Sequence, residues 1–81
     1  MDRQVFESRM RKARTLAELG DKPDYWTGYQ RGLRRVYHGE KFGTDEEHQK
    51  WLALEGDPDL ARDARGRGYR DGYQEKEVEH D

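Results

Sequence analysis

The chain has 81 residues, which is enough for one small domain with a modest core. Only 31% of the residues are hydrophobic and 42% are charged, so the core must depend on a few large side chains. The net charge of −2 argues against a strong grip on nucleic acid, and the lack of cysteine excludes disulfides and thiolate metal sites. The sequence shows neither the apolar run of a signal peptide nor the longer run of about 18 residues that a membrane span requires, so we expect a cytoplasmic protein without a membrane partner.

The first half of the chain predicts two helices. Apolar residues spaced three and four apart indicate an amphipathic helix over about 3–19, and Gly20 follows it where a left-handed cap is expected. A second helix is predicted over about 23–38, with Asp21 as its N-terminal cap and Pro23 in its first turn. Its apolar face comprises six residues: Tyr25, Trp26, Tyr29, Leu33, Val36 and Tyr37.

The second half predicts two more helices. Thr44 and Glu47 have the spacing of a capping box and predict a helix over about 45–54. The pair Asp57-Pro58 is a typical helix start and predicts a fourth helix over about 58–75. Residues 78–81 are expected to fray. The sequence therefore predicts a single all-α domain over residues 1–77, a small bundle of about four short helices.

A motif occurs twice within the predicted helices, as GYQRG at 28–32 and as GYRDG at 68–72. A helical glycine costs about 1 kcal/mol relative to alanine, so four of them need a compensating contact. We expect the helices to cross closely at their glycine faces, with packing residues Gly28, Gly32, Gly68 and Gly72. Two alternatives are that one glycine face accepts a partner, or that Gly66 and Gly68 form a non-helical turn. We expect Gly32→Leu to unfold the domain and Gly66→Ala to be harmless or stabilising.

The remaining large apolar residues predict the core. It should contain seven side chains from the first three helices: Phe6, Met10, Leu16, Trp26, Leu33, Trp51 and Leu52. A core this small also makes a homodimer an alternative, because pairing two copies would bury further apolar area.

Basic residues form two clusters. The first contains Arg9, Arg11, Lys12 and Arg14, and the second contains Arg31, Arg34 and Arg35 beside tyrosines. Arginine next to an exposed aromatic ring can contact a protein partner or an RNA phosphate and base. The predicted contact residues are Tyr29, Arg31, Arg34, Arg35, Tyr69 and Tyr73.

Residues suited to catalysis or metal binding do not cluster in the sequence. The three histidines, His38, His48 and His80, are dispersed, and the single serine, Ser8, has no base at helical spacing. The carboxylates occupy positions that are expected to be exposed, where nothing would raise a pKa. We therefore predict no enzymatic activity, no metal and no cofactor.

The motif Gly28-Tyr29-x-x-Gly32, followed by Trp51, resembles the ribosome modulation factor family of small helical bacterial proteins. The resemblance covers under a third of the chain. It implies binding to the ribosome and its RNA, with Arg31, Arg34 and Arg35 as the RNA contacts. Size and composition indicate a bacterial or phage accessory protein whose main partner is another protein. Binding to RNA or the ribosome and a purely structural homodimer are the alternatives.

Overall fold

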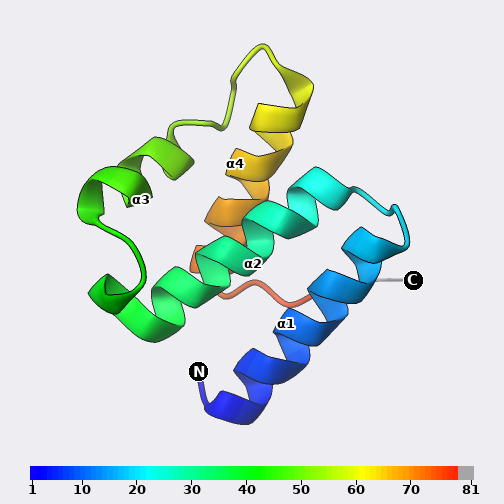
Figure 1. The fold of residues 1–81 in the computed structure, drawn as a ribbon, viewed down its shortest axis with the longest axis vertical. Coiled ribbons are helices and arrows are strands. Elements are labelled where there is room, and N and C mark those ends of the chain that lie inside the picture. The colour runs from blue at the N-terminus through cyan, green and yellow to red at the C-terminus, as the bar shows by residue number, and fades with distance from the viewer. Residues whose placement is uncertain (79–81) are drawn as a thin grey trace.

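The computed structural model describes residues 1–78 (Figure 1). Along these residues it contains four α-helices and one short 3-10 turn: α1 (Arg3–Glu18), α2 (Pro23–His38), η1 (Gly39–Lys41), α3 (Asp45–Leu52) and α4 (Leu60–Tyr73). No strand occurs within the described range, so the predicted all-α bundle is confirmed. None of the helices in this range is long and apolar enough to cross a membrane.

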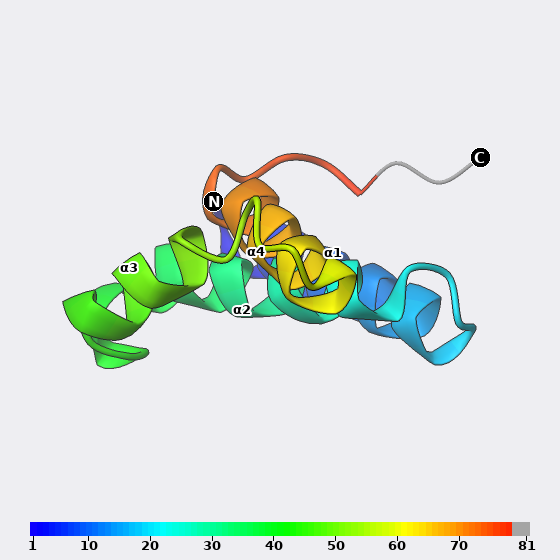
Figure 2. The same cartoon turned by 90° about the horizontal axis from the view of Figure 1, so that it is seen from above.

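Helix α2 lies at the centre of the fold, between α1 on one side and α3 on the other, and α4 crosses it (Figure 1). Seen from above, the helices form a flat arrangement (Figure 2), and the molecule extends over 33 × 30 × 17 Å. A helix with its side chains is about 10–12 Å wide, so the short dimension holds no more than two helix layers. The core is consequently thin, as the composition predicts.

The crossing of α2 and α4 is built on the four glycines of the repeated motif. Each glycine faces a main-chain carbonyl of the other helix: Gly28 faces Arg65, Gly32 faces Tyr69, Gly68 faces Tyr25, and Gly72 faces Tyr29. A Cβ atom at any of these positions would lie within 3.0 Å of that carbonyl oxygen, closer than side chains pack. From one contact to the next, the facing residues move toward the C-terminus on both helices. The close crossing at glycine-rich faces is therefore confirmed.

Gly66 also lies in α4 and also lacks room for a side chain. A Cβ atom there would meet the amide nitrogen of Glu55 and the carbonyl carbon of Leu54, both within 3.0 Å. The segment that follows α3 passes over α4 at this point. The prediction that Gly66→Ala is harmless is therefore wrong, and so is the alternative of a turn at Gly66 and Gly68, because both residues are helical.

Two helix starts differ from the prediction. The residue that precedes α2 is Lys22, which has a left-handed conformation, and not the predicted cap Asp21. The amide of Asp21 donates a hydrogen bond to the carbonyl of Leu16 at the end of α1. Helix α4 begins at Leu60 because the Asp59 carboxylate accepts hydrogen bonds from the amides of Ala61 and Arg62. The predicted start at Asp57-Pro58 is two residues too early. Asp57 instead accepts a hydrogen bond from the amide of Asp59 at 2.8 Å.

The helix ends follow the local chemistry. Gly20 has a φ of +82° after α1, as expected for a left-handed cap. Helix α3 ends at Leu52, two residues before its predicted end, and α4 ends at Tyr73 rather than at residue 75. Beyond Tyr73 the chain turns back toward α1, and Val78 packs against the core. The other residues of the predicted frayed tail, 79–81, lie outside the described range.

The predicted core residues are confirmed at the centre of the core, but those predicted at its edge differ from the structure. Leu16, Trp26 and Leu33 are buried, and Phe6 and Met10 pack against them while partly exposed. Trp51 and Leu52 are only half-buried, because α3 lies at the periphery. Three buried hydrophobic residues were not among the predicted core: Ala13, Tyr29 and Tyr69.

Candidate interaction surface

Three of the six predicted contact residues are buried. Tyr29 is 1% exposed, Tyr69 is 2% exposed and Arg35 is 7% exposed. The Tyr29 hydroxyl donates a hydrogen bond to the carbonyl of Lys76 at 2.6 Å, which fixes the C-terminal segment to α2. These three side chains stabilise the fold, and a partner cannot reach them directly.

Arg35 connects α2 to the segment that leads into α3. Its guanidinium donates to the carbonyl of Gly43 at 2.8 Å and to the carboxylate of Asp45 at 2.7 Å. Asp45 is the first residue of α3, and Thr44 caps that helix by accepting from the amide of Glu47. The position of α3 therefore depends on a buried arginine of α2.

The other predicted residues, Arg31, Arg34 and Tyr73, are at least partly exposed. Together with Phe42 and Trp51 they form what we call the aromatic–arginine face. The Arg31 guanidinium lies 4.9 Å from the centre of the Trp51 ring and 5.4 Å from that of Phe42. The Arg34 guanidinium lies 5.9 Å from the centre of the Phe42 ring. These distances are typical of cation–π contacts, so both arginines are held against aromatic rings.

Buried residues support this face from below. The Trp51 ring stacks on Tyr69, with centroids 5.5 Å apart, and Tyr69 stacks in turn on Tyr73. Tyr73 is 37% exposed and thus brings the aromatic layer to the surface. Glu47 pairs with Arg31 at 3.3 Å and fixes its orientation. The exposed rings and guanidinium groups are therefore held in place before any partner arrives.

His48 lies beneath the face, between α3 and α4. Its Nδ1 atom is 2.6 Å from the Tyr69 hydroxyl. Burial lowers the pKa of His48, and the nearby Arg35 guanidinium lowers it further, whereas the Asp45 carboxylate opposes this change. Burial also raises the pKa of the Tyr69 hydroxyl. A neutral imidazole accepting from the tyrosine is the arrangement that these shifts favour.

Sequence reasoning missed Phe42 as a surface residue and placed Trp51 in the core. Phe42 belongs to the short connector after η1, where a lone aromatic residue carries no periodicity. The sequence gives one hint only. A phenylalanine in a short loop between two polar helix ends would be unfavourable if its ring were fully exposed to water. The contact between Phe42 and two arginines of α2 depends on how the connector folds back.

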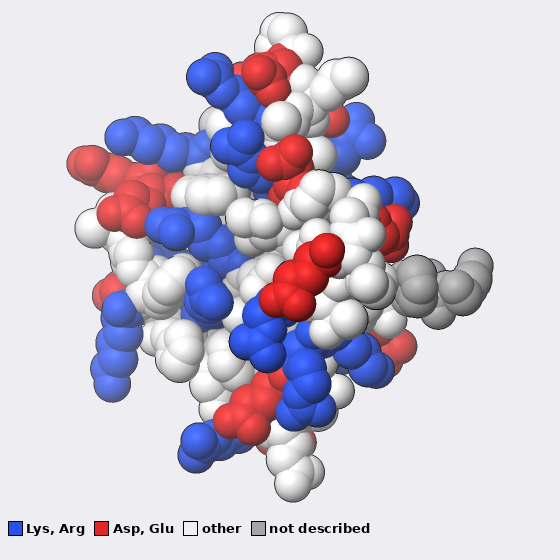
Figure 3. All heavy atoms as spheres, turned by 45° about the vertical axis from the view of Figure 1, so that its right-hand side comes forward, with Lys and Arg blue, Asp and Glu red and all other residues white. Residues whose placement is uncertain are grey.

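The four residues of the basic cluster on α1 lie in different environments. Arg9 donates to the carbonyl of Glu75 at 2.9 Å, and so it is engaged with the C-terminal segment. Arg11, Lys12 and Arg14 form no ion pair with any residue in 1–78. Basic and acidic side chains are interspersed over the face that includes α1 (Figure 3). The surface in this view carries no broad field of one sign.

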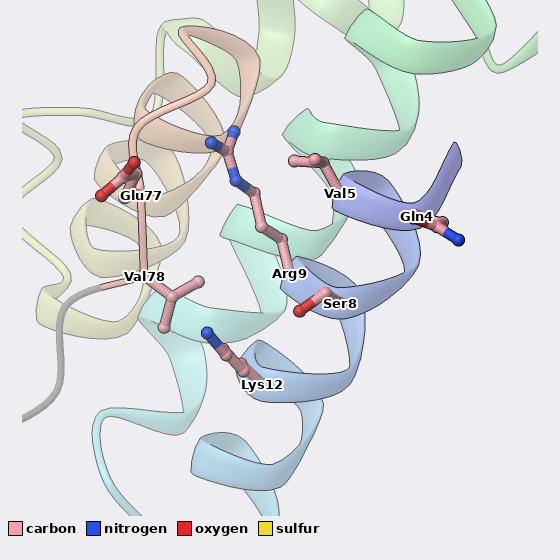
Figure 4. Close-up of a pocket in the computed structure, with 7 residues that line it drawn as sticks. All are labelled: Gln4, Val5, Ser8, Arg9, Lys12, Glu77 and Val78. Carbon is pink, nitrogen blue, oxygen red and sulfur yellow. The ribbon is translucent and has the colours of Figure 1, made fainter. Parts of the chain in front are cut away.

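Shallow grooves run between α1 and the C-terminal segment. Figure 4 shows the first, in which Arg9 and Lys12 extend from α1 into the space beside Val78. A second groove adjoins it on the far side of Val78, and we call it the α1 groove. It is lined by Arg11, Lys12, Thr15, Leu16, Leu19 and Val78.

No protein family, no curated protein and no solved structure matches this chain with significance. The resemblance to the ribosome modulation factor family stays a prediction from the motif alone. Among residues 1–78, no three histidine or carboxylate side chains converge as metal ligands would. The functional argument accordingly depends on the surfaces described above.

Proposed function

We propose that this chain is a small non-enzymatic accessory or regulatory protein that binds another protein through the aromatic–arginine face. One observation carries the proposal: Arg31 and Arg34 are held against half-exposed aromatic rings that rest on a buried layer. Tryptophan, tyrosine and arginine are the residues that most often dominate the binding energy of protein interfaces. Trp51 and Tyr73 are only partly covered by the fold, so a partner could bury them further.

The support beneath these residues favours tight binding. Arg31 is constrained by Glu47 and Trp51, and Tyr73 is constrained by Tyr69 and His48. Side chains that are already ordered lose less conformational entropy when a partner covers them. The half-exposed positions of Phe42 and Trp51 leave apolar area that a partner can remove from water.

RNA is the second candidate ligand, because an arginine against an aromatic ring also suits a phosphate and a stacked base. The net charge of −2 favours the protein partner instead. A structural homodimer is the third candidate, and it draws on exposed apolar residues such as Leu60, which is 83% exposed.

Affinity capture tests this proposal with the full chain. The wild-type protein, Arg34→Glu and Lys12→Glu are each incubated with a lysate of the encoding organism, half of which has been treated with nuclease. We expect one protein partner to be retained in both halves and to be lost with Arg34→Glu. Lys12→Glu is the matched control, because it reverses an exposed, unpaired charge on α1 and should retain that partner.

The other outcomes decide between the candidates. If the retained material disappears after nuclease treatment and its binding weakens steeply with salt, the ligand is RNA and not a protein. No retained partner, together with a mass that rises with protein concentration, would favour the homodimer. A partner that Arg34→Glu still retains would remove the aromatic–arginine face from the proposal.

A further inference from the structure

His48 lies where the supports of the aromatic–arginine face meet. It is 9% exposed, its Nδ1 atom is 2.6 Å from the Tyr69 hydroxyl, and its ring centre is 4.5 Å from that of Tyr73. The Trp51 ring stacks on the same Tyr69, with centroids 5.5 Å apart. A change in the hydrogen bond between His48 and Tyr69 therefore reaches two rings of the face, Trp51 and Tyr73.

The Tyr69 hydroxyl has little access to any other acceptor. Tyr69 is 2% exposed, and the cavity beside it has a volume of about 10 Å³, at most the space of one water molecule. The cations near it, Arg35 and Arg31, only donate hydrogen bonds. The acceptors that line the cavity are engaged: Glu47 with Arg31, the Gly43 carbonyl with Arg35, and the Thr44 hydroxyl with the amide of Glu47.

Protonation of His48 removes the acceptor that Tyr69 uses. Both ring nitrogens of an imidazolium carry a proton, so Nδ1 can then only donate. The Tyr69 oxygen can receive that hydrogen bond, but the hydrogen of the hydroxyl loses its own partner. It must then compete for an acceptor that holds Arg31, Arg35 or the start of α3 in place.

The charges around His48 decide when this happens. The titratable groups around it are Arg31 and Arg35 from α2, Asp45 and Glu47 from α3, and Tyr69 and Tyr73 from α4. Burial lowers the pKa of His48, the Arg35 charge lowers it further, and the Asp45 charge opposes this change. The ring is therefore neutral at pH 7 and accepts a proton only below the ordinary histidine value near pH 6.5.

We propose that protonation of His48 releases the aromatic–arginine face while the helix crossing beneath it stays intact. Trp51 and Tyr73 have a fixed position when His48 is neutral and lose it when the ring is charged. The crossing of α2 and α4 depends on main-chain contacts of four glycines, which do not titrate. The consequence rests on the proposed function, because a partner that recognises the fixed rings would bind more weakly as the pH falls.

The two tryptophans allow a test with the full chain and without a partner. Trp51 belongs to the face, whereas Trp26 is buried in the core. NMR follows their indole N–H signals and the ring signals of the histidines from about pH 7.5 to about pH 5, above most carboxylate titrations. We expect the Trp51 signal to shift with the same midpoint as His48, below about pH 6.5, and the Trp26 signal to stay unchanged.

Three variants link the shift to the hydrogen bond. His48→Asn should abolish the Trp51 shift, because an amide does not titrate. Tyr69→Phe should abolish it although His48 still titrates, since no hydroxyl hydrogen remains to be displaced. His38→Asn is the matched control: His38 lies at the exposed end of α2, so the Trp51 shift should persist in this variant.

Several results would overturn the proposal. They are a His48 ring that stays neutral over the whole range, a Trp51 signal that ignores its titration, and a Trp51 shift that persists in His48→Asn or Tyr69→Phe. An equal change at Trp26 would show that the whole protein unfolds, and would also overturn it. Because no partner is needed, this failure is distinguishable from failure of the proposed function, which is a capture experiment without a protein partner that depends on Arg34.

Discussion

At the four glycines of the crossing, Gly28, Gly32, Gly68 and Gly72, the lack of a side chain allows α2 and α4 to come into contact through their backbones. A glycine within a helix costs about 1 kcal/mol relative to alanine, so each of these positions weakens its own helix. The loss is offset because the α-carbon approaches a carbonyl of the other helix, such as that of Tyr69. Contacts between an α-CH group and a carbonyl contribute modestly, and close approach also improves the packing of the neighbouring rings.

Whether Gly32→Ala raises or lowers the free energy of unfolding therefore tests the close crossing of the two helices. If there were room at Gly32, alanine would raise the free energy of unfolding by about 1 kcal/mol through helix propensity. Because a Cβ atom would meet the backbone of α4, we expect Gly32→Ala to lower it by about 1–3 kcal/mol. We expect Gly32→Leu to prevent folding. Urea denaturation followed by circular dichroism measures both effects.

Thr27→Ala is the matched control for this experiment, since Thr27 lies on the exposed side of the same helix. Its stability should stay within about 0.5 kcal/mol of the wild type. Gly66→Ala should also destabilise, because the backbone of Leu54 and Glu55 occupies the space that the methyl group needs. A Gly32→Ala protein as stable as the wild type would contradict the close crossing.

His48 makes stability depend on pH. Its pKa is lowered in the folded protein, chiefly by burial and then by Arg35, whereas the unfolded chain keeps an ordinary value near 6.5. As the pH falls through 6.5, the unfolded chain gains a proton that the folded chain does not yet accept. Stability should therefore decrease from about pH 6.5 downward, and His48 should contribute no pH dependence above about pH 8.

His48→Asn tests this at the same position, because the asparagine amide can accept from Tyr69 but does not titrate. Urea denaturation is compared between the two proteins from about pH 7 to about pH 5, a range above most carboxylate titrations. We expect the wild type to lose more stability than the variant over this interval. Parallel curves would show that His48 does not remain neutral in the folded state.

At the scale of the elements, local sequence signals account for most helix boundaries. The end of α1 at Gly20 and the start of α3 at Thr44 depend on one residue in a position that its chemistry favours. Such interactions lie within four residues, so the sequence alone predicts them. The exposed side chains of the α1 groove, Arg11 and Lys12, were likewise predicted as a basic cluster, though not as the rim of a groove.

The boundaries that differ have competing candidates nearby. Asp57 and Asp59 can both cap α4, and Asp59 is chosen because Asp57 bonds to the Asp59 amide instead. Beyond α4, Glu75 adopts a left-handed conformation with a φ of 60° and closes the helix end. Glycine is the usual residue there, so a glutamate gives no warning that the helix stops.

Which helix face is buried depends on contacts that the sequence does not specify. The periodicity of α2 correctly groups Tyr29 with Leu33 on one stripe. Because α1 and α4 cover α2 from two sides, that stripe becomes core, and Tyr29 is unavailable to a partner. Tyr69 and Tyr73 differ in the same way: Tyr69 lies in the second repeat and Tyr73 directly follows it, yet they are 2% and 37% exposed.

At the scale of the whole molecule, the central crossing separates two outward surfaces. Helix α1, whose residues line the α1 groove, lies on one side of α2, and α3, the helix that contains Trp51, lies on the other (Figure 1). Neither surface supplies a residue to the other. The small core of this thin domain leaves much of each outer helix accessible.

The C-terminal segment completes this arrangement by joining α4 to α1. It satisfies the buried hydroxyl of Tyr29, receives a hydrogen bond from Arg9, and adds Val78 to the core. We therefore expect a chain that ends at Tyr73 to lose about 1–3 kcal/mol of stability, because the hydrogen bond of Tyr29 and the apolar contact of Val78 are both lost. Comparison with a chain that ends at Val78 isolates the contribution of residues 74–78.

A second variant separates the hydrogen bond from the apolar contact. Tyr29→Phe removes the hydroxyl but keeps the ring, so in the chain ending at Val78 it should cost about 1 kcal/mol. In the chain ending at Tyr73 the same change should cost nothing or stabilise, since no partner for the hydroxyl remains. Thermal and urea denaturation of the four proteins measure this coupling. Equal effects of Tyr29→Phe in both chains would mean that the segment does not hold Tyr29 as the structure describes.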